Sequence, residues 1–361
     1  MNSTKTPWER PQADAAHRPP LLRPAEEART PGRAKVAREA VHGVLLLNKP
    51  RGLTSQNALF RVRRVLRAAK AGHGGTLDPL ADGLLMLCFG AATKFAQRHL
   101  EADKRYTARV RLGETTTTDD AEGAVTQRRI VSIDRAQVEA VLPRFVGTIA
   151  QTPPLHSALK RDGKPLYAYA RAGEAVDVAP RAVRIDSIHV LGLDDGVLTL
   201  DVRCGKGTYI RALARDIGVA LGCGAHLAGL TRTESAGFRL DQAIGLDAAE
   251  AAGTALRERL LRPDALLQDL PRQDLEYPQA AAFLQGRRLS GLAPLPDAAA
   301  DSEIRVYGPP AAGAPDMLLG VGARNGAELV PRRLLSPEEL GSPTPPQPRS
   351  GSGPIHQDAT P

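Results

Sequence analysis

Cysteines, histidine clusters and long apolar runs are all missing or scarce in this chain. Its three cysteines, Cys88, Cys204 and Cys223, are widely spaced and its eight histidines are scattered. These spacings match no metal-binding pattern, so we expect buried, reduced thiols and no zinc site. No apolar run reaches the roughly 18 residues of a membrane span, and the polar N-terminus has no apolar signal segment. The sequence therefore predicts a cytoplasmic protein that binds no metal and no membrane.

The chain carries an excess of positive charge, with a formal net charge of +8. Residues 1–40 hold eight basic and five acidic side chains, so much of the excess lies in the rest of the chain. A basic folded body is compatible with a polyanionic partner such as nucleic acid. This signal is modest, because many basic proteins bind no nucleic acid.

Composition divides the chain into four parts. Residues 1–40 contain six prolines and charges without a period, and residues 341–361 are rich in Gly, Ser and Pro. Both segments are predicted to be disordered. Residues 41–270 mix strand-like and helix-like apolar patterns, which predicts an α/β body. Residues 271–340 hold short apolar runs separated by Gly and Pro, which predicts a small β domain.

The body begins with an apolar run at residues 44–47 and a helix predicted over residues 56–69. One face of this helix carries Arg61, Arg64 and Arg67. Those side chains are either simply solvated or lie along phosphates. Further strands are predicted at residues 84–89, 106–112, 183–193 and 197–204.

A glycine-rich loop, residues 72–83, presents His73 and Asp78. Pro79 restricts the backbone of Asp78 to extended or turn conformations. A carboxylate on a loop with several glycines permits close approach of a ligand. The alternative is a tight turn in which Asp78 caps the local backbone. The loop alone does not decide between these two interpretations.

A second charged segment, residues 204–211, leads into a helix predicted to run to residue 221. Arg211 lies near its start, off the apolar stripe. The spacing of a phosphate-binding loop is absent, because a glycine separates Lys206 from Thr208, so we expect no nucleotide cofactor. An arginine at this position is instead suited to pair with a carboxylate and keep it ionised.

Tyr106 begins a predicted strand directly after two basic residues. Its ring could stack on a nucleic-acid base, which is worth about 1–3 kcal/mol. The alternative is an ordinary strand aromatic. The Thr/Asp-rich loop at residues 113–123 lacks the ligand spacing of a calcium loop, so we expect no cation there.

Taken in order, these segments resemble the TruB family of tRNA pseudouridine-55 synthases. The resemblance covers residues 42–240 and extends more weakly to about residue 340. It implies an α/β (α+β) pseudouridine synthase fold, with a mixed, largely antiparallel sheet and a central cleft, followed by a small C-terminal PUA-like β-barrel. The matching motifs are at residues 43–55, 73–83, 104–106, 157–171, 206–211 and 222–230.

The resemblance also implies a function, isomerisation of uridine to pseudouridine at position 55 in the T loop of tRNA by base flipping, in a monomer without a cofactor. In the matching motifs Asp78 is the catalytic aspartate, Tyr106 stacks on the target base and Arg211 pairs with the aspartate. Other implied substrate-binding residues are His73, which inserts into the T loop, Tyr209, Leu230 and, in the opening motif, Lys49 as support. Candidate contacts to the RNA backbone are Arg61, Arg64, Arg67, Lys160, Lys164 and Arg171.

Three positions depart from the usual residues of that family. Asp82 stands where threonine is usual, Thr117 where aspartate is frequent and His156 where tyrosine is frequent. Asp82 is a second acid four residues from Asp78. We expect it either to cap a helix or, if it lies close, to raise the pKa of Asp78.

Other functions fit parts of the same pattern. A tRNA-folding chaperone or RNA-binding module would use the cleft without essential catalysis, and Asp78 would then be unnecessary. A synthase of the same fold could act on another RNA. An unrelated carboxylate hydrolase would need a second acid, for which Asp82 is the candidate.

Overall fold

The computed structural model describes residues 37–157, 159–161, 163–174, 176–293, 295 and 301–341. The segments predicted to be disordered, residues 1–40 and 341–361, lie outside these ranges except for residues 37–40 and 341. None of the helices in the described ranges combines the length and the apolar character that crossing a bilayer requires. All three cysteines are buried and free, as expected.

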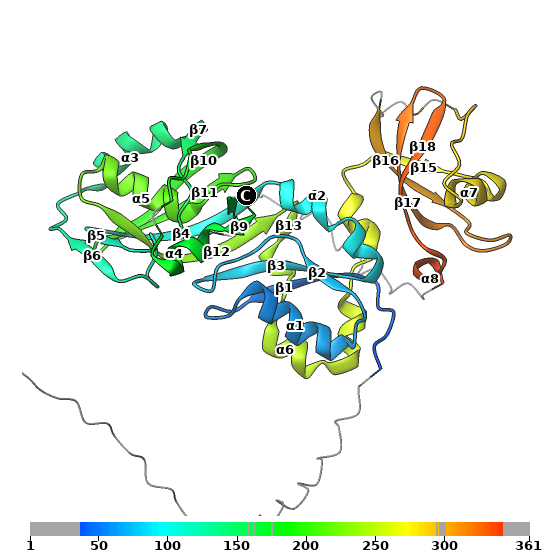
Figure 1. Ribbon diagram of the computed structural model, residues 1–361, viewed down its shortest axis with the longest axis horizontal. Helices are drawn as coiled ribbons and strands as arrows, with labels where there is room; N and C mark the ends of the chain where they lie inside the picture. Colours follow the sequence, from blue (N-terminus) through cyan, green and yellow to red (C-terminus); the bar gives the residue numbers. More distant parts are fainter. Residues whose placement is uncertain are drawn as a thin grey trace, which may run out of the picture. The chain divides into compact units, whose positions relative to one another are not determined.

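A ten-stranded mixed sheet forms the body of the chain (Figure 1). From one edge to the other its strands are β14 (Ile244–Gly245), β1 (Gly43–Lys49), β3 (Ala81–Phe89), β12 (Ala225–Ser235), β4 (Lys104–Leu112), β11 (Val197–Cys204), β10 (Arg181–Asp194) and β7 (Gly147–Gln151). In addition, β2 (Ala71–His73) pairs with β3 and β13 (Phe238–Arg239) pairs with β12. The pairs β1–β14 and β3–β12 are parallel and the others are antiparallel. The predicted, largely antiparallel sheet is therefore confirmed.

Short hairpins and helices surround this sheet. The hairpins are β5 (Glu114–Thr116) with β6 (Val125–Arg128), and β8 (Lys160–Arg161) with β9 (Lys164–Pro165). The α-helices of this part are α1 (Ser55–Leu66), α2 (Ala96–Glu101), α3 (Arg135–Val141), α4 (Leu166–Ala172), α5 (Ile210–Ala220) and α6 (Leu246–Ala251). The 3-10 helices are η1 (Gly90–Lys94), η2 (Leu142–Phe145), η3 (Leu240–Gln242), η4 (Gly253–Arg259) and η5 (Pro263–Leu267).

Three apolar cores contact this sheet, and two of them meet at its centre. The first core packs α1 and α6, which lie together below β1 in Figure 1, against β1 and β3. The second core packs α5 and α3 against β4, β11 and β12. Tyr106 and Leu230 contact both cores. The parallel pairing of β3 with β12 therefore joins two separately packed halves, and the loop that carries Asp78 enters the sheet at this junction.

Helix α1 is shorter than the sequence pattern predicts. Thr54 caps its start by accepting a hydrogen bond from the backbone N–H of Asn57, at 3.1 Å. The predicted helix extended to residue 69, but α1 ends at Leu66 because Arg67 adopts a left-handed conformation with φ of 53°. The Arg67 N–H then satisfies carbonyl groups of the last turn, as in other left-handed helix ends.

The C-terminal part is a four-stranded sheet. Its order is β15 (Arg272–Asp274), β16 (Ser302–Gly308), β17 (Met317–Asn325) and β18 (Glu328–Leu334). Two helices belong to it, α7 (Tyr277–Leu284) and α8 (Pro337–Leu340). Phe283 of α7 packs among buried residues of β16, β17 and β18. Short strands therefore lie within residues 271–340, as predicted, whereas a separate domain there and closure of its sheet into a PUA-like barrel stay predictions.

Candidate active site

The Asp78 loop is fixed on both sides of the carboxylate. The Ser55 hydroxyl, at the start of α1, donates to the Leu77 carbonyl at 3.0 Å and accepts from the Leu77 N–H at 2.8 Å. On the other side the Ala81 N–H donates to the Asp78 carbonyl at 3.0 Å, and Arg51 Nε donates to the Leu80 carbonyl at 3.1 Å. The backbone around Asp78 is therefore set by α1 and by the start of β3.

Arg211 is the centre of the site. Its Nε lies 3.0 Å from Asp78 Oδ2 and forms an ion pair with it. The Nε–H bond is not directed at that oxygen closely enough to count as a hydrogen bond. Its Nη1 lies 3.5 Å from Asp120 Oδ2 and donates to the Thr118 carbonyl at 3.3 Å. Its Nη2 donates to the His156 carbonyl at 2.9 Å. One guanidinium thus joins three segments of the chain to α5.

Arg211 is buried although it lies off the apolar stripe of α5. The residue is buried, with 5% of its surface exposed. The apolar stripe of α5 does not explain this burial. It is explained by the polar partners, because a buried charge is stable only when it is paired and hydrogen-bonded.

Asp120 is a site residue that the sequence pattern did not reveal. It is buried, and its Oδ1 accepts from the Thr118 hydroxyl at 2.5 Å and from the Glu122 N–H at 3.0 Å. The Thr/Asp-rich loop was the available signal, because it offered acids and hydroxyls near a turn. The absence of calcium spacing in that loop does not bear on whether its acids pair with an arginine.

Asp82 plays neither of the two roles expected of it. It lies in β3, which begins at Ala81 and not at residue 84, so it caps no helix. In the sheet it stands opposite Thr231 of β12. The acid that raises the pKa of Asp78 is Asp120.

The pKa of Asp78 reflects opposing influences. Burial raises it most, the positive charge of Arg211 opposes that rise, and the negative charge of Asp120 adds to it. Lys49 favours the ionised form as well. Arg211 is therefore the main influence that keeps this carboxylate charged.

Tyr106, Leu230 and Tyr209 surround this charged cluster. Tyr106 in β4 stands opposite residue 232 of β12, and Leu230 in β12 stands opposite Ala81 and residue 108. Tyr209 precedes α5, and its backbone N–H donates to Gln151 Oε1 at 2.8 Å. Burial raises the pKa of both phenols, and the charge of Asp78 adds to both shifts. Both hydroxyls are therefore neutral at ordinary pH.

His73 and Lys49 flank the loop. His73 lies in β2 opposite Leu87 of β3. Burial lowers its pKa, and its Nδ1 has no hydrogen-bond partner among the described residues. Lys49 is fully buried, and its Nζ donates to the carbonyls of Pro50 and Leu53 at 2.8 and 2.6 Å. Burial lowers the pKa of Lys49 to about 8.

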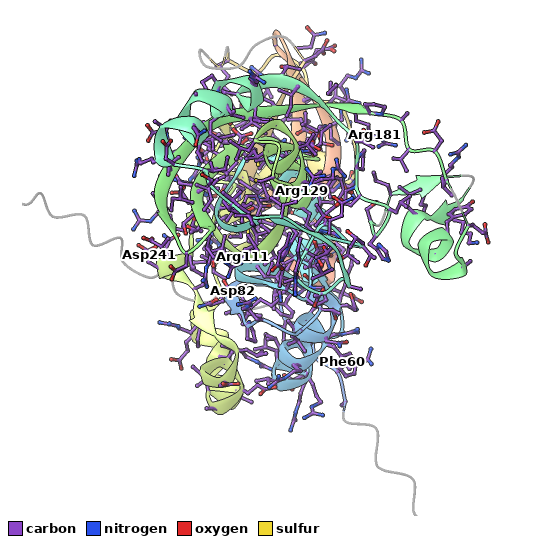
Figure 2. The ribbon with its side chains drawn as sticks, turned by 90° about the vertical axis from the view of Figure 1, so that its left-hand side faces the viewer. Phe60, Asp82, Arg111, Arg129, Arg181 and Asp241 are labelled. Atoms are coloured by element: carbon purple, nitrogen blue, oxygen red, sulfur yellow. The ribbon has the colours of Figure 1, made fainter. Side chains whose placement is uncertain are left out.

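The basic side chains proposed for RNA contact fall into two groups. Three have acidic partners: Arg61 pairs with Glu250, Arg67 lies 3.9 Å from Glu39 and Lys164 lies 3.2 Å from Glu174. Arg64 and Lys160 are exposed. Arg171 lies on α4, but its side chain is outside the described set. Figure 2 shows further arginines, Arg111, Arg129 and Arg181, on one side of the molecule.

The two other positions that depart from the usual family residues are His156, which contacts Arg211, and Thr117, which lies on the Thr/Asp-rich loop with Asp120. His156 provides the backbone carbonyl that accepts from Arg211. Thr117 is exposed, and its N–H donates to the Ala124 carbonyl at 3.0 Å.

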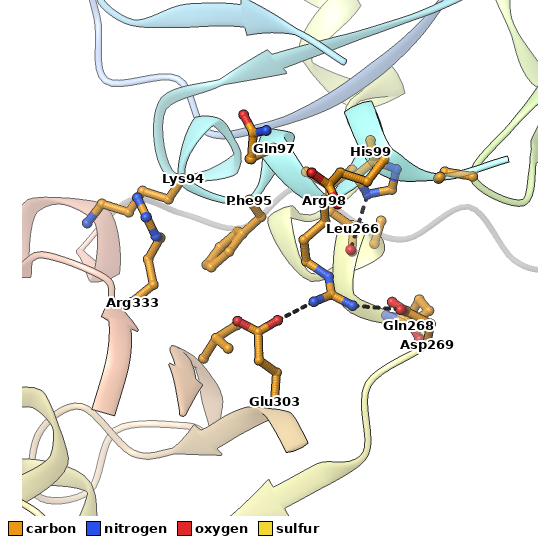
Figure 3. A pocket seen from close by; sticks show the side chains of 15 residues that line it. Lys94, Phe95, Gln97, Arg98, His99, Leu266, Gln268, Asp269, Glu303 and Arg333 are labelled. Carbon is orange, nitrogen blue, oxygen red and sulfur yellow. Dashed lines mark hydrogen bonds and ion pairs between the residues drawn. The ribbon is translucent and has the colours of Figure 1, made fainter. Parts of the chain in front are cut away.

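A separate pocket of about 680 Å³ lies beside α2 (Figure 3). Arg98 of α2 crosses it, paired with Glu303 of β16 and, at 2.7 Å, with Asp269. His99 Nε2 lies 3.2 Å from the Leu266 carbonyl. The residues lining this pocket include none of the site residues predicted from sequence.

Solved structures define the class of the fold. The chain is similar to one in "Structure of H/ACA RNP bound to a substrate RNA containing 2'-deoxyuridine", with a TM-score of 0.61 and 22% identity over 82% of this chain and 86% of that one. It is also similar to one in "Crystal Structure of a Cbf5-Nop10-Gar1 Complex", with a TM-score of 0.59 and 25% identity over 84% and 82%. The fold is that of the pseudouridine synthases, as predicted.

Sequence relatives narrow this class to one family. The N-terminal domain of "TruB family pseudouridylate synthase" matches residues 63–210, and "tRNA pseudouridylate synthase B C-terminal domain" matches residues 211–269. The tRNA pseudouridine synthase B of Ralstonia pickettii (strain 12J) is 53% identical over 86% of this chain and 99% of its own length. That of Burkholderia mallei (strain ATCC 23344) is 53% identical over 84% and 97%. The chain belongs to the TruB family, and it is a pseudouridine synthase.

Proposed function

We propose that this enzyme converts uridine 55 in the T loop of tRNA to pseudouridine, with Asp78 as its essential residue. The observation that carries the proposal is the ion pair of Asp78 with the buried Arg211, at the junction of the two halves of the sheet. The substrate class is supported by the relatives, which are named tRNA pseudouridine synthases over nearly their whole length.

The chemistry breaks the C–N bond between ribose and uracil and forms a C–C bond in its place. Because the target atoms are inaccessible inside a stacked loop, the uridine must first leave its stack. Asp78 then acts as a nucleophile or as a base, and both roles require the ionised carboxylate. Arg211 favours that form, and its charge is strongest when bound RNA excludes water from the partly exposed carboxylate.

The uracil would lie against Tyr106 and Leu230. Tyr106 would stack on the detached base and keep it in place while it rotates, since an aromatic face binds any base without reading its edge. Tyr209 would line the other side of the pocket. His73 would insert into the T loop beside the flipped nucleotides, with its neutral imidazole favoured by burial.

Residues 41–270 would form the catalytic domain and residues 271–340 a PUA-like RNA-binding domain of a monomeric, cytoplasmic enzyme. Phosphate contacts would come first from the exposed Arg64 and Lys160. Arg61, Arg67 and Lys164 would have to exchange their acidic partners for phosphate. Such contacts make tRNA affinity fall with rising salt.

The test is tritium release from a tRNA transcript labelled at C5 of every uridine, because that hydrogen is lost when C5 bonds to the ribose. We expect release by the wild type, and none by Asp78→Asn although it still binds tRNA. Asp274→Asn, which changes an exposed aspartate in the C-terminal sheet, is the matched control and should release as the wild type does. A transcript with cytidine at position 55 should release nothing.

Each outcome separates the alternatives. Retained turnover by Asp78→Asn would contradict the assigned role of that carboxylate. Tritium release from the transcript with cytidine at position 55 would show that the enzyme modifies another uridine. Tight tRNA binding without release by any variant would favour the chaperone interpretation.

A further inference from the structure

Arg232 is a second buried arginine, and it lies behind the site. In the sheet it stands opposite Gly83 of β3 on one side and Tyr106 of β4 on the other. Gly83 has φ of 100°, and a Cβ there would lie 2.4 Å from the Arg232 carbonyl oxygen. The close approach of the two strands therefore requires glycine at residue 83. It places the Arg232 side chain between the Asp78 loop and Tyr106.

The guanidinium of Arg232 binds the Asp78 loop directly. Its Nε donates to the Leu84 carbonyl at 2.7 Å, and its Nη2 donates to the Gly75 carbonyl at 3.3 Å. Gly75 lies three residues before Asp78. One planar side chain thus ties β3 to the loop, and only 1% of the residue's surface is exposed.

This cation differs from Arg211 in its partners. Its Nε and Nη2 donate to backbone carbonyls, and none of the ion pairs among the described residues includes it. A buried charge without a carboxylate partner is costly. No paired carboxylate in the described part of the chain neutralises the positive charge of Arg232, so that charge also influences the titratable groups nearby. The charge of Arg232 favours the lower pKa of His73 and opposes the rise that burial causes in the pKa of Tyr106.

The donor chemistry fixes what the tyrosine can do. A guanidinium has only donors, whereas a phenol oxygen both accepts and donates. Because Tyr106 stands opposite Arg232 in the sheet, its phenol oxygen would be turned toward the guanidinium and its proton away from it. In that orientation the Tyr106 hydroxyl would donate a hydrogen bond toward the uracil and would not accept a proton from it.

We propose that Arg232 is a positioning residue for isomerisation, which holds the Gly75 end of the Asp78 loop and orients the Tyr106 hydroxyl as a donor to the rotating uracil. This rests on the proposed roles of Asp78 and Tyr106. It assigns a role to an arginine that itself touches neither the base nor the sugar.

The test is a double-mutant cycle of Arg232→Lys and Tyr106→Phe. The measured quantity is the single-turnover rate of tritium release, with enzyme in saturating excess over the C5-labelled transcript. Arg232→Lys keeps the charge but loses the fork that binds both carbonyls, and we expect it to slow the reaction by about 100-fold, as small misplacements in a site do. Because Tyr106→Phe removes the hydroxyl that Arg232 orients, the double variant should be much less impaired than the product of the two single effects.

Further measurements separate this role from a simple loss of structure. Arg63→Lys is the matched control, because Arg63 also donates to two backbone carbonyls, at residues 68 and 69, but lies on α1. We expect it to leave the rate unchanged. For Arg232→Lys the tRNA dissociation constant, measured by filter binding, should stay within about threefold of the wild type.

Two results would overturn the proposal. The first is an Arg232→Lys rate equal to that of the wild type. The second is strict multiplication of the two single effects, as an unrelated packing defect would give. If Arg232→Lys melts below the assay temperature, Arg232→Gln is used in the same cycle. If uridine 55 is not the substrate, the transcript with cytidine at position 55 will still release tritium. The double-mutant cycle is then measured with that transcript.

Discussion

Arg211 and Arg98 each join two carboxylates from different segments, and they do so in opposite surroundings. Arg211 lies between Asp78 and Asp120, and Arg98 lies between Asp269 and Glu303. The Arg211 and Asp120 side chains are 6% and 4% exposed, whereas that of Asp78 is 41% exposed. In the Arg98 group the exposures are 31% for the arginine and 68% and 49% for the acids.

The same combination of one arginine and two acids therefore has different energetic consequences in the two places. Around Arg98, water and salt screen the charges, and such pairs are worth at most about 1 kcal/mol. Around Arg211, little water is present to screen them, so each charge changes the pKa of the next and each lost partner leaves an unpaired buried group. The comparison teaches that burial of the arginine and of its second acid, beside one partly exposed carboxylate, distinguishes the Arg211 group from the Arg98 group.

Replacing Arg211 should have the largest effect. Arg211→Met removes the cation that keeps Asp78 ionised, and we expect the single-turnover rate to fall by about 10³-fold. Without Arg211 the pKa of Asp78 rises. As the pH is lowered, the remaining activity should therefore disappear at a higher pH than the activity of the wild type does. Single-turnover tritium release across a pH series measures both.

A stability measurement separates the two roles of Arg211. Arg211→Met leaves Asp120 buried without its cation, which should lower the free energy of unfolding by about 3–5 kcal/mol. Adding Asp120→Asn should restore much of that stability in urea unfolding without restoring the rate. Recovery of the rate in the double variant would contradict the role given to Arg211.

Asp120→Asn should have a smaller effect on the rate than Arg211→Met, and it should shift the acid limb of the pH–rate profile in the opposite direction. Asp120 raises the pKa of Asp78, so its neutralisation lowers that pKa. The reaction needs the carboxylate, which is fully ionised above its pKa and protonated as pH falls through it. The acid limb of the rate profile should therefore move to lower pH, with a loss of about tenfold at neutral pH from the disturbed Arg211 geometry. A limb that moves upward would show that Asp120 acts mainly through Arg211.

These residues also show how far sequence reasoning reaches. The pairing of Asp78 with Arg211 could be predicted, because each lies in a short motif that resembles the TruB family, and the structure contains that ion pair. Asp120 and Arg232 could not, since their burial depends on which distant segments meet. Arg232 becomes part of the site only when β12 pairs with both β3 and β4 in one register. The end of α1 was missed for a local reason, the left-handed backbone of Arg67, which apolar periodicity does not encode.

Arg215 provides an intermediate case on the same helix. One turn after Arg211, its Nη1 pairs with Asp119 at 2.9 Å and its Nη2 donates to the Thr152 carbonyl at 3.0 Å. It has no contact with Asp78 among its recorded partners, and its side chain is 27% exposed. Arg215→Met should lower the free energy of unfolding by about 1–3 kcal/mol, measured in urea. A rate loss as large as that of Arg211→Met would remove the distinction drawn between the two arginines.

Replacing Arg98 should have the smallest effect. Arg98→Met removes both ion pairs beside the α2 pocket, yet the two acids stay exposed to water, so the free energy of unfolding should change by less than about 1 kcal/mol. Adding salt should reduce even this difference, because exposed pairs are screened. The single-turnover rate with saturating enzyme should equal that of the wild type. A slower rate at unchanged stability would break the comparison, because it would mean that an exposed arginine pair on α2 acts on the Asp78 site as strongly as a buried one.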